Sequence, residues 1–161
     1  MTWRVHDRAG EQPDPRTFVI EDSLGYLVNR AARAFANRLS AELRPFDVGI
    51  GQWAVLMHLW SHDAMTQAQL ARRVAIEQPT MVRTIDRMER DGLVTRNPDP
   101  DDRRAIRITL TERGSALRDQ LVPLADGVNR RAAAGLTDEE VATLRGLLAR
   151  LGAAEPGTLP V

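Results

Sequence analysis

One charged stretch in the middle of the chain combines side chains that are suited to binding DNA. Gln78 and Thr80 stand at its start, and Arg83 and Arg87 follow at helical spacing. Glutamine and arginine have the geometry to bind the edges of adenine and guanine in a major groove, and the N-terminus of a helix favours phosphate. Pro79 suits the first turn of such a helix because its φ angle is already fixed near the helical value.

These residues are predicted to form an amphipathic helix that runs from Pro79 to Asp91 and ends at Gly92. At about 100° per residue, its apolar side chains fall on one arc and its polar ones on the opposite arc. The predicted inner arc holds Met81, Val82, Ile85 and Met88, and the predicted outer arc holds Thr80, Arg83, Thr84, Arg87 and Arg90. For a lone helix of this kind, a solvated face that carries pairs such as Asp86–Arg90 is the preferred interpretation. The neighbouring elements therefore decide between the two interpretations.

Those neighbours predict a winged helix-turn-helix. A capping-box pattern, Thr66-x-x-Gln69, opens a short helix that ends at Val74, and a tight turn connects it to the charged helix. Two β-prone runs follow, Leu93–Asn97 and Ala105–Leu110, and a turn-rich stretch joins them into a hairpin.

Two arginines follow the turn of this hairpin. By itself the hairpin would be an ordinary solvated turn. Behind a helix-turn-helix, Arg103 and Arg104 are placed to enter a narrow minor groove, whose negative potential attracts arginine. Arginines only slightly outnumber acidic residues across residues 66–113. The positive potential must therefore come from geometry, with the arginines pointing outward.

Helical periodicity dominates the remaining ordered sequence. It predicts further helices over residues 23–43, 50–61, 111–134 and 137–151, the last opened by a second capping box, Thr137-x-x-Glu140. The helix over 50–61 places Trp53, Leu56, Met57, Leu59 and Trp60 on one arc. The last helix carries more apolar surface than a small monomer can cover, which predicts a dimer; its apolar residues are Leu136, Val141, Leu144, Leu147, Leu148 and Leu151.

Composition places the chain among single-domain globular proteins. Of 161 residues, 43% are hydrophobic, and 22 basic residues, all arginine, balance 22 acidic ones. This balance excludes a basic coat over the whole surface. No apolar run approaches the roughly 20 residues that span a bilayer, and the N-terminus has no signal-peptide pattern. We expect a soluble cytoplasmic protein with a flexible arm at 1–17, one domain at 18–152 and a flexible tail at 153–161.

No pattern in the sequence points to catalysis, a cofactor or a metal. The chain has no cysteine, which excludes disulfides, thiolate zinc sites and a cysteine nucleophile. It also lacks the GxSxG, P-loop and GxGxxG motifs. His58 and His62 are four residues apart, but no HExxH pattern accompanies them. The sequence therefore predicts a protein that is not an enzyme and holds neither metal nor cofactor.

The run AQLARRVAIEQPTMVRTIDRMERDGLVTRNPDPDDRRAIRITLTERG resembles the winged helix-turn-helix core of the MarR family of bacterial transcription regulators. Residues 76–86 are especially similar to the SlyA-like branch of this family. A DDRR wing that is followed by a strand and then by LTERG is specific for the family when the three occur in this order. The resemblance covers roughly residues 20–152 and extends to Trp53 and Arg44-Pro45. Two positions depart from the family: Ala75 replaces a frequent glycine in the turn, and Gly49 replaces the usual Ser/Thr cap.

The resemblance implies a mainly α fold of six helices with a small β-hairpin wing. The winged core would span about 50–110, and helices at about 20–45 and 112–152 would form a homodimer. Its partner would be double-stranded DNA that carries a pseudo-palindromic operator. The DNA-binding residues expected from the helix face and the resemblance together are Gln78, Pro79, Thr80, Arg83, Arg87, Arg103 and Arg104.

Members of this family often respond to small phenolic or carboxylate ligands. Here Arg30 and Arg33 are three residues apart, so they share a helix face on which they could clamp one carboxylate. Trp53 and Met57 would line the same pocket. The alternatives are a salt-bridge face for the two arginines and plain core for the two apolar residues.

The sequence thus predicts a homodimeric bacterial repressor, bound to the nucleoid and released from its operator by a small aromatic carboxylate. Two other functions stay open at this point. One is an activator or anti-silencer of the SlyA type, and the other is a winged-helix protein-interaction module that does not bind DNA.

Overall fold

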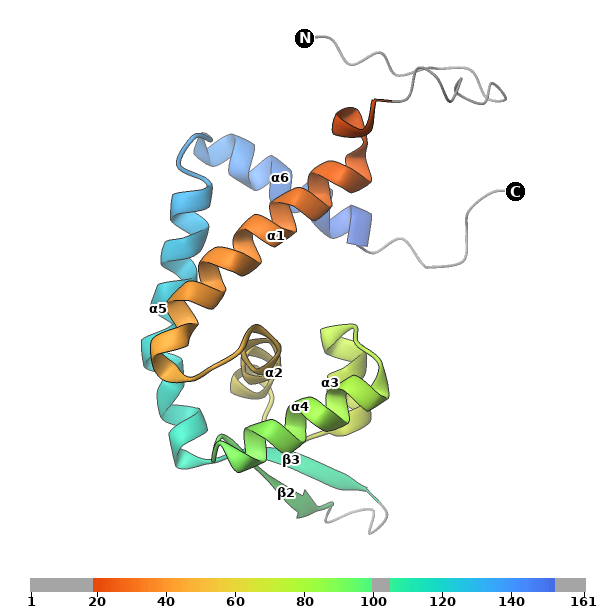
Figure 1. Ribbon diagram of the computed structural model, residues 1–161, viewed down its shortest axis with the longest axis vertical. Helices are drawn as coiled ribbons and strands as arrows, with labels where there is room; N and C mark the ends of the chain where they lie inside the picture. Colours follow the sequence, from red (N-terminus) through yellow and green to blue (C-terminus); the bar gives the residue numbers. More distant parts are fainter. Residues whose placement is uncertain (1–18, 100–104, 153–161) are drawn as a thin grey trace, which may run out of the picture. The chain divides into compact units, whose positions relative to one another are not determined.

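The structure, a computed structural model, describes residues 19–99 and 105–152, which form six α-helices and a small sheet (Figure 1). In chain order the elements are a 3₁₀ helix at Ile20–Asp22, α1 Leu24–Leu43, a 3₁₀ helix at Arg44–Phe46, α2 Ile50–Ser61, β1 Met65–Thr66, α3 Gln67–Val74, α4 Gln78–Arg90, β2 Val94–Pro98, β3 Ile106–Leu110, α5 Glu112–Ala132 and α6 Asp138–Gly152. The predicted fold class, mainly helical with a β wing, is confirmed.

The chain divides into two compact units, residues 1–34 and 35–161. In its described part, the first unit contains the first 3₁₀ helix and the beginning of α1, where Leu24 and Tyr26 are exposed. The second unit contains the end of α1 and all later elements. It holds the predicted DNA-binding residues that the structure describes.

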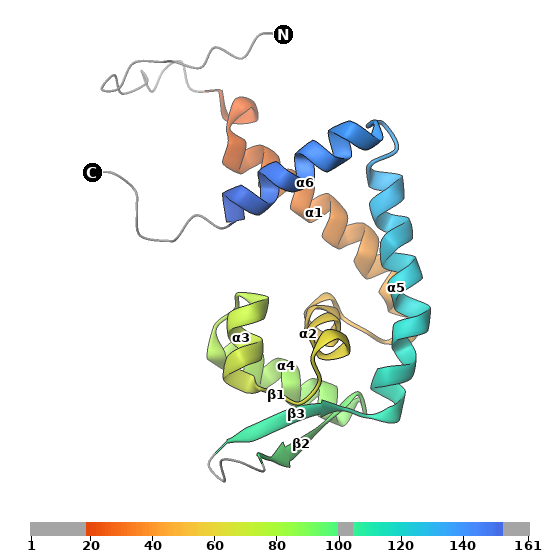
Figure 2. The same cartoon turned by 180° about the vertical axis from the view of Figure 1, so that it is seen from behind.

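The sheet of the second unit has three antiparallel strands in the order β1-β3-β2. The predicted hairpin is confirmed as β2 and β3, which pair from Val94↔Leu110 to Pro98↔Ile106. The sequence did not reveal β1, which pairs with β3 through Met65↔Ile108 (Figure 2). Two residues are too few to show the alternation by which a strand is recognised.

The core of the second unit is assembled from the C-terminal end of α1, from α2, α3, α4 and α5, and from the sheet. Its largest fully buried side chains are Leu43, Leu56, Leu59, Leu70, Met81, Ile85, Met88, Leu93, Ile108, Leu121, Val55 and Val94. One prediction for α2 is wrong, because Met57 is 45% exposed whereas Val55 is fully buried. The reason is that α2 contacts α3, α4, α5 and β3, so its buried positions do not follow a single arc.

A glycine allows α5 to pack closely against the start of β2. A Cβ atom at Gly114 would lie 2.1 Å from the carbonyl oxygen of Leu93, so a side chain cannot be accommodated there. The indole Nε1 of Trp60 donates a hydrogen bond to the Gly114 carbonyl (2.9 Å), which ties α5 to α2. Thr111 caps the helix by accepting from the Gly114 N–H, as the sequence predicted.

Candidate nucleic-acid interface

The turn between α3 and α4 determines the orientation of α4 relative to α3. The predicted capping box is confirmed: Thr66 Oγ1 accepts from the Gln69 N–H (3.2 Å), and the Gln69 side chain accepts from the Thr66 N–H (2.8 Å). The helix closes at Ala75, whose φ of 57° lies in the left-handed region. For alanine this conformation costs roughly 1 kcal/mol, which accounts for the glycine expected at this position.

The inner side of α4 fixes the helix to the rest of the second unit. Met81, Ile85 and Met88 are fully buried, and α4 contacts α2, α3 and β2. The prediction that Val82 belongs to this buried arc is wrong, because its side chain is 41% exposed. Val82 lies at the edge of the arc, and none of the elements that the structure describes covers it.

The outer side of α4 presents the side chains that the sequence predicted to contact DNA. The five that lie on this helix, all exposed, are Gln78, Pro79, Thr80, Arg83 and Arg87. Their side chains make no hydrogen bond or ion pair with any residue that the structure describes. Pro79 occupies the first turn of the helix as predicted. The structure therefore provides two guanidinium groups without an acidic partner in the described part of the chain along the exposed side of α4, and the N-terminus of the same helix adds a site that favours phosphate.

Two carboxylates on the same helix are bound by an arginine of the wing. Arg96 of β2 donates from Nη2 to Asp86 Oδ1 (2.5 Å) and from Nη1 to Glu89 Oε2. The Asp86–Arg90 ion pair that the solvated-face interpretation offered does not form, since Arg90 Nε donates instead to the backbone carbonyl of Asp86 (3.4 Å).

The pKa of Arg96 reflects this ion-pair cluster. Partial burial of the guanidinium lowers the pKa, but the hydrogen bonds and charges of Asp86 and Glu89 outweigh that effect and raise it above the ordinary value. Arg96 therefore stays charged, couples β2 to α4 and neutralises the acidic groups of the α4 surface. Sequence spacing does not reveal this cluster, because Arg96 lies ten residues beyond Asp86 in a different element.

A second ion pair fixes the described part of the wing. Arg107 of β3 donates from Nε to Asp99 Oδ2 (2.6 Å) and from Nη1 to the carbonyl oxygen of Ala64 (3.3 Å). Asp99 is only 7% exposed, so its charge depends on such partners. The predicted wing contacts Arg103 and Arg104 lie outside the described residues.

The candidate effector residues occur in different units. Arg30 and Arg33 are exposed in the first unit, and the Arg30 guanidinium lies 5.8 Å from the centre of the Tyr26 ring. In the second unit Trp53 is buried in an edge-to-face contact with Trp60, with ring centres 5.6 Å apart. Met57 is exposed, as described above, so it is not core.

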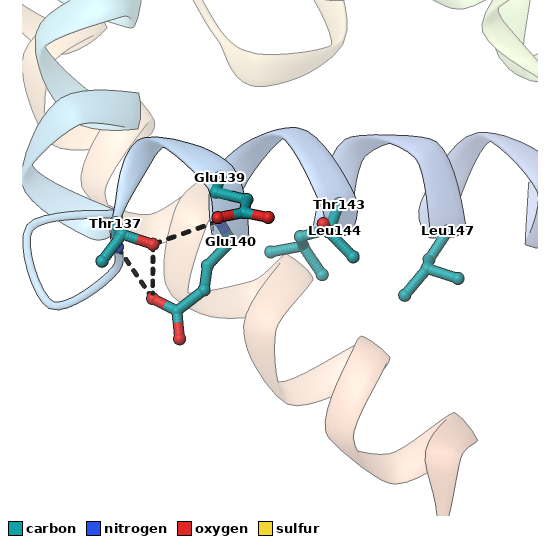
Figure 3. A pocket seen from close by; sticks show the side chains of 6 residues that line it. All are labelled: Thr137, Glu139, Glu140, Thr143, Leu144 and Leu147. Carbon is teal, nitrogen blue, oxygen red and sulfur yellow. Dashed lines mark hydrogen bonds between the residues drawn. The ribbon is translucent and has the colours of Figure 1, made fainter.

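Surface hollows occur elsewhere. One is formed by α6 and its cap alone and is lined by Thr137, Glu139, Glu140, Thr143, Leu144 and Leu147 (Figure 3). Another lies at the junction of α5 and α6. Neither contains a candidate effector residue. Among the described side chains, no group of three or more possible ligands is arranged to hold a metal ion.

Known proteins match this chain over the region that contains the α4 face. Residues 50–106 match the model of the MarR family. A probable transcriptional regulator from Pseudomonas aeruginosa is 32% identical, with a TM-score of 0.76, and the match covers 83% of this chain and 99% of that one.

Two further structures concern proteins whose DNA binding is described. A mutant MarR from E. coli in complex with operator DNA is 29% identical, with a TM-score of 0.75 and coverage of 80% of this chain and 92% of that one. BpsR of Bordetella bronchiseptica, whose DNA binding is regulated by 6-hydroxynicotinic acid, is 26% identical, with a TM-score of 0.80 and coverage of 86% and 99%. Of the helices in the described part of the present chain, none combines the length and apolar character that a membrane crossing needs.

Proposed function

This chain belongs to the MarR family of DNA-binding transcriptional regulators, and we propose that it is a homodimeric repressor that leaves its operator when a small aromatic carboxylate binds. The observation that carries the DNA-binding role is the outer face of α4. Its arginines have no acidic partner among the described residues, although the chain has no net charge. A regulator of this kind acts on the nucleoid, in the bacterial cytoplasm.

In this proposal the first half of α4 lies in the major groove. Gln78, Thr80 and Arg83 meet base edges, and Arg87 meets phosphate on the rim of the groove. Arg103 and Arg104 bind the adjacent minor groove. Because arginine there senses groove width rather than individual bases, the wing would favour flanks rich in A·T pairs.

The dimer in this proposal is formed by the terminal helices. Support comes from α6, on which Leu144, Leu147, Leu148 and Leu151 are 44–53% exposed in the single chain. A symmetric dimer of such lobes would bind two half-sites that are about one turn of DNA, roughly 10 base pairs, apart.

The effector in this proposal is an aromatic carboxylate. BpsR is regulated by 6-hydroxynicotinic acid, which belongs to this chemical class. In the present chain, Arg30 and Arg33 share one face of α1, and the Arg30–Tyr26 contact places a cation beside an aromatic ring. A panel of hydroxynicotinates, salicylates and cinnamates should include a compound that weakens operator binding about 5- to 150-fold, the usual range of allosteric coupling. If none does so at millimolar concentration, the effector proposal is wrong.

The DNA-binding role is tested on operator fragments selected from the source genome by the purified protein. Arg83→Ala should weaken binding to the selected operator by about 1–3 kcal/mol and relax base preference at one position in each half-site. Replacing both Arg103 and Arg104 by alanine should weaken operator and scrambled DNA more evenly. It should also flatten the salt dependence by about one log–log unit for each phosphate that the variant no longer binds.

Arg118→Ala provides the matched control, since Arg118 lies on α5 and donates only to the backbone carbonyl of Trp60. It should leave base preference unchanged. If Arg83→Ala weakens both DNAs equally and leaves base preference intact, α4 does not read the major groove.

A further inference from the structure

Val82 is an aliphatic side chain on the largely polar and charged outer surface of α4. It is 41% exposed, although Met81, immediately before it, and Ile85, one turn after it, are fully buried. Pro79, one turn earlier on the helix, is also exposed. The two residues form a small apolar strip along the first half of α4, beside the free guanidinium of Arg83.

The polar groups further along this strip are already bound within the protein. Asp86 lies one turn beyond Val82, and its carboxylate is paired with Arg96 of β2 at 2.5 Å. Glu89, on the same flank of the helix, is paired with Arg96 as well. Pro79 and Val82 are therefore accessible to a ligand, whereas the carboxylates of Asp86 and Glu89 are bound to Arg96 of β2.

The chemistry of the major groove limits what such a strip can recognise. Among the groups that base pairs expose there, the 5-methyl of thymine is the apolar one, and small aliphatic side chains contact it. Val82 is the fifth residue of a helix whose N-terminal residues, in a helix-turn-helix, lie closest to the base edges. Its β-branched side chain has few rotamers, so little entropy is lost when the contact forms.

We infer that Val82 determines sequence specificity by packing against the 5-methyl group of one thymine in each half-site. This inference rests on the proposed DNA-binding function and adds a specificity-determining residue to it. The contact would complement Arg83, because guanidinium groups select hydrogen-bond acceptors whereas Val82 selects a methyl group.

The test replaces each thymine of the selected operator, one at a time, by deoxyuridine, which differs only in lacking the methyl group. Dissociation constants are measured by fluorescence anisotropy for the wild-type protein and for Val82→Ala. At one thymine per half-site, deoxyuridine should weaken wild-type binding about fourfold, the factor for losing roughly one buried methyl group. Val82→Ala should bind thymine DNA more weakly by a similar factor and should be insensitive to deoxyuridine at that position.

Val122→Ala is the matched control, because Val122 lies on α5 and is 40% exposed. This variant should keep the wild-type response to deoxyuridine. Val82→Thr, which retains one of the two methyl groups, should retain part of the response. Thermal unfolding of each variant identifies any loss of fold, which we do not expect from truncating an exposed side chain.

Three results would overturn the inference. An equal deoxyuridine effect in wild type and Val82→Ala shows that another residue reads the methyl group. An equal loss of affinity for operator and scrambled DNA shows that Val82 contacts the sugar–phosphate backbone. If the wild-type protein selects no specific DNA at all, the proposed function fails first and this inference fails with it.

Discussion

The helices α4 and α6 are both amphipathic, but their apolar sides have different surroundings. On α4, Met81, Ile85 and Met88 are fully buried by other parts of the same chain. On α6, Val141 is half-buried and all other residues with a described side chain are exposed, including the four leucines. An amphipathic pattern therefore shows that a helix has a buried side in its working state, but not whether the covering partner belongs to the same chain.

This difference indicates different roles for the two helices, ligand binding for α4 and contact with a partner for α6. The apolar side chains on the inner side of α4 are buried within the second unit. This packing fixes the position of the helix and leaves its outer side accessible to a ligand. The four leucines of α6 are about half exposed, so burying each of them fully would add about half of the roughly 1.5–3 kcal/mol that complete burial of such a side chain contributes. A second copy of the chain is the partner that we propose for them. The predictions below test this contrast.

The largest effect is expected from a charge on the apolar side of α6. Leu144→Glu should convert the dimer to a monomer, because symmetry would place two unpaired carboxylates in one apolar interface. Loss of the linkage between half-sites should weaken operator binding by about 100- to 10,000-fold. Light scattering and anisotropy titrations measure the two effects.

Ala149→Glu is the control for this change. Ala149 is exposed on the opposite side of the same helix, so this variant should remain a dimer. A Leu144→Glu protein that stays dimeric and binds its operator normally would contradict the proposed role of α6.

The next effect compares the two apolar sides directly, in the monomeric Leu144→Glu background. Ile85→Ala on α4 should lower the free energy of unfolding by about 2–5 kcal/mol, because it leaves a cavity in a closed core. Leu147→Ala on α6 should change it by less than about 0.5 kcal/mol, since the side chain is already half in water. Urea unfolding gives both values, and equal losses would show that α6 is covered within one chain.

A smaller effect on operator affinity is expected from the ion pairs that neutralise the two carboxylates on the outer side of α4. Arg96→Gln leaves Asp86 and Glu89 unneutralised next to the proposed DNA path, so operator affinity should fall about fivefold, or roughly 1 kcal/mol. Adding Asp86→Asn and Glu89→Gln should restore most of this affinity.

Arg150→Gln removes the same charge from α6 and serves as the control. It should leave operator affinity within about twofold of wild type, since solvent and salt screen distant charges. An equal loss for both variants would mean that Arg96 acts only through net charge and not through its two partners.

The smallest effect concerns the cap of α6. The Glu140 carboxylate accepts from the backbone N–H of Thr137 (2.8 Å) and from its hydroxyl (3.1 Å), and both bonds lower the pKa of Glu140 below the ordinary glutamate value (Figure 3). A lowered pKa in the folded state means that the cap stabilises α6 fully above the pKa of the unfolded chain. This stabilisation is lost as the pH falls through the folded value.

An NMR titration of the Glu140 carboxyl carbon measures this pKa. Thr137→Ala removes the hydroxyl bond and should move the pKa part of the way back up. Thr143→Ala, on the same helix, should leave it unchanged. A Glu140 pKa at the ordinary value in the wild-type protein would contradict the cap seen in the structure.

Features that depend on residues close in sequence could be predicted before the structure was known. Both capping boxes, Thr66 with Gln69 and Thr137 with Glu140, form as expected, because donor and acceptor are only three residues apart. Ala75, which stands where the family often has glycine, adopts the left-handed conformation that glycine tolerates best. The order of residues from α3 through the wing was also sufficient to identify the family.

Features that depend on long-range neighbours required the tertiary structure. Periodicity grouped Val82 and Met57 with buried residues, yet both are exposed because no element between residues 19–99 or 105–152 extends over them. Strand β1 exists only through its pairing with β3, which lies much further along the chain, in the register Met65↔Ile108. In the sequence, Arg83 and Arg96 are both arginines near acidic residues, and nothing distinguishes them. The fold places two carboxylates beside Arg96, whereas it places none of the described carboxylates beside Arg83.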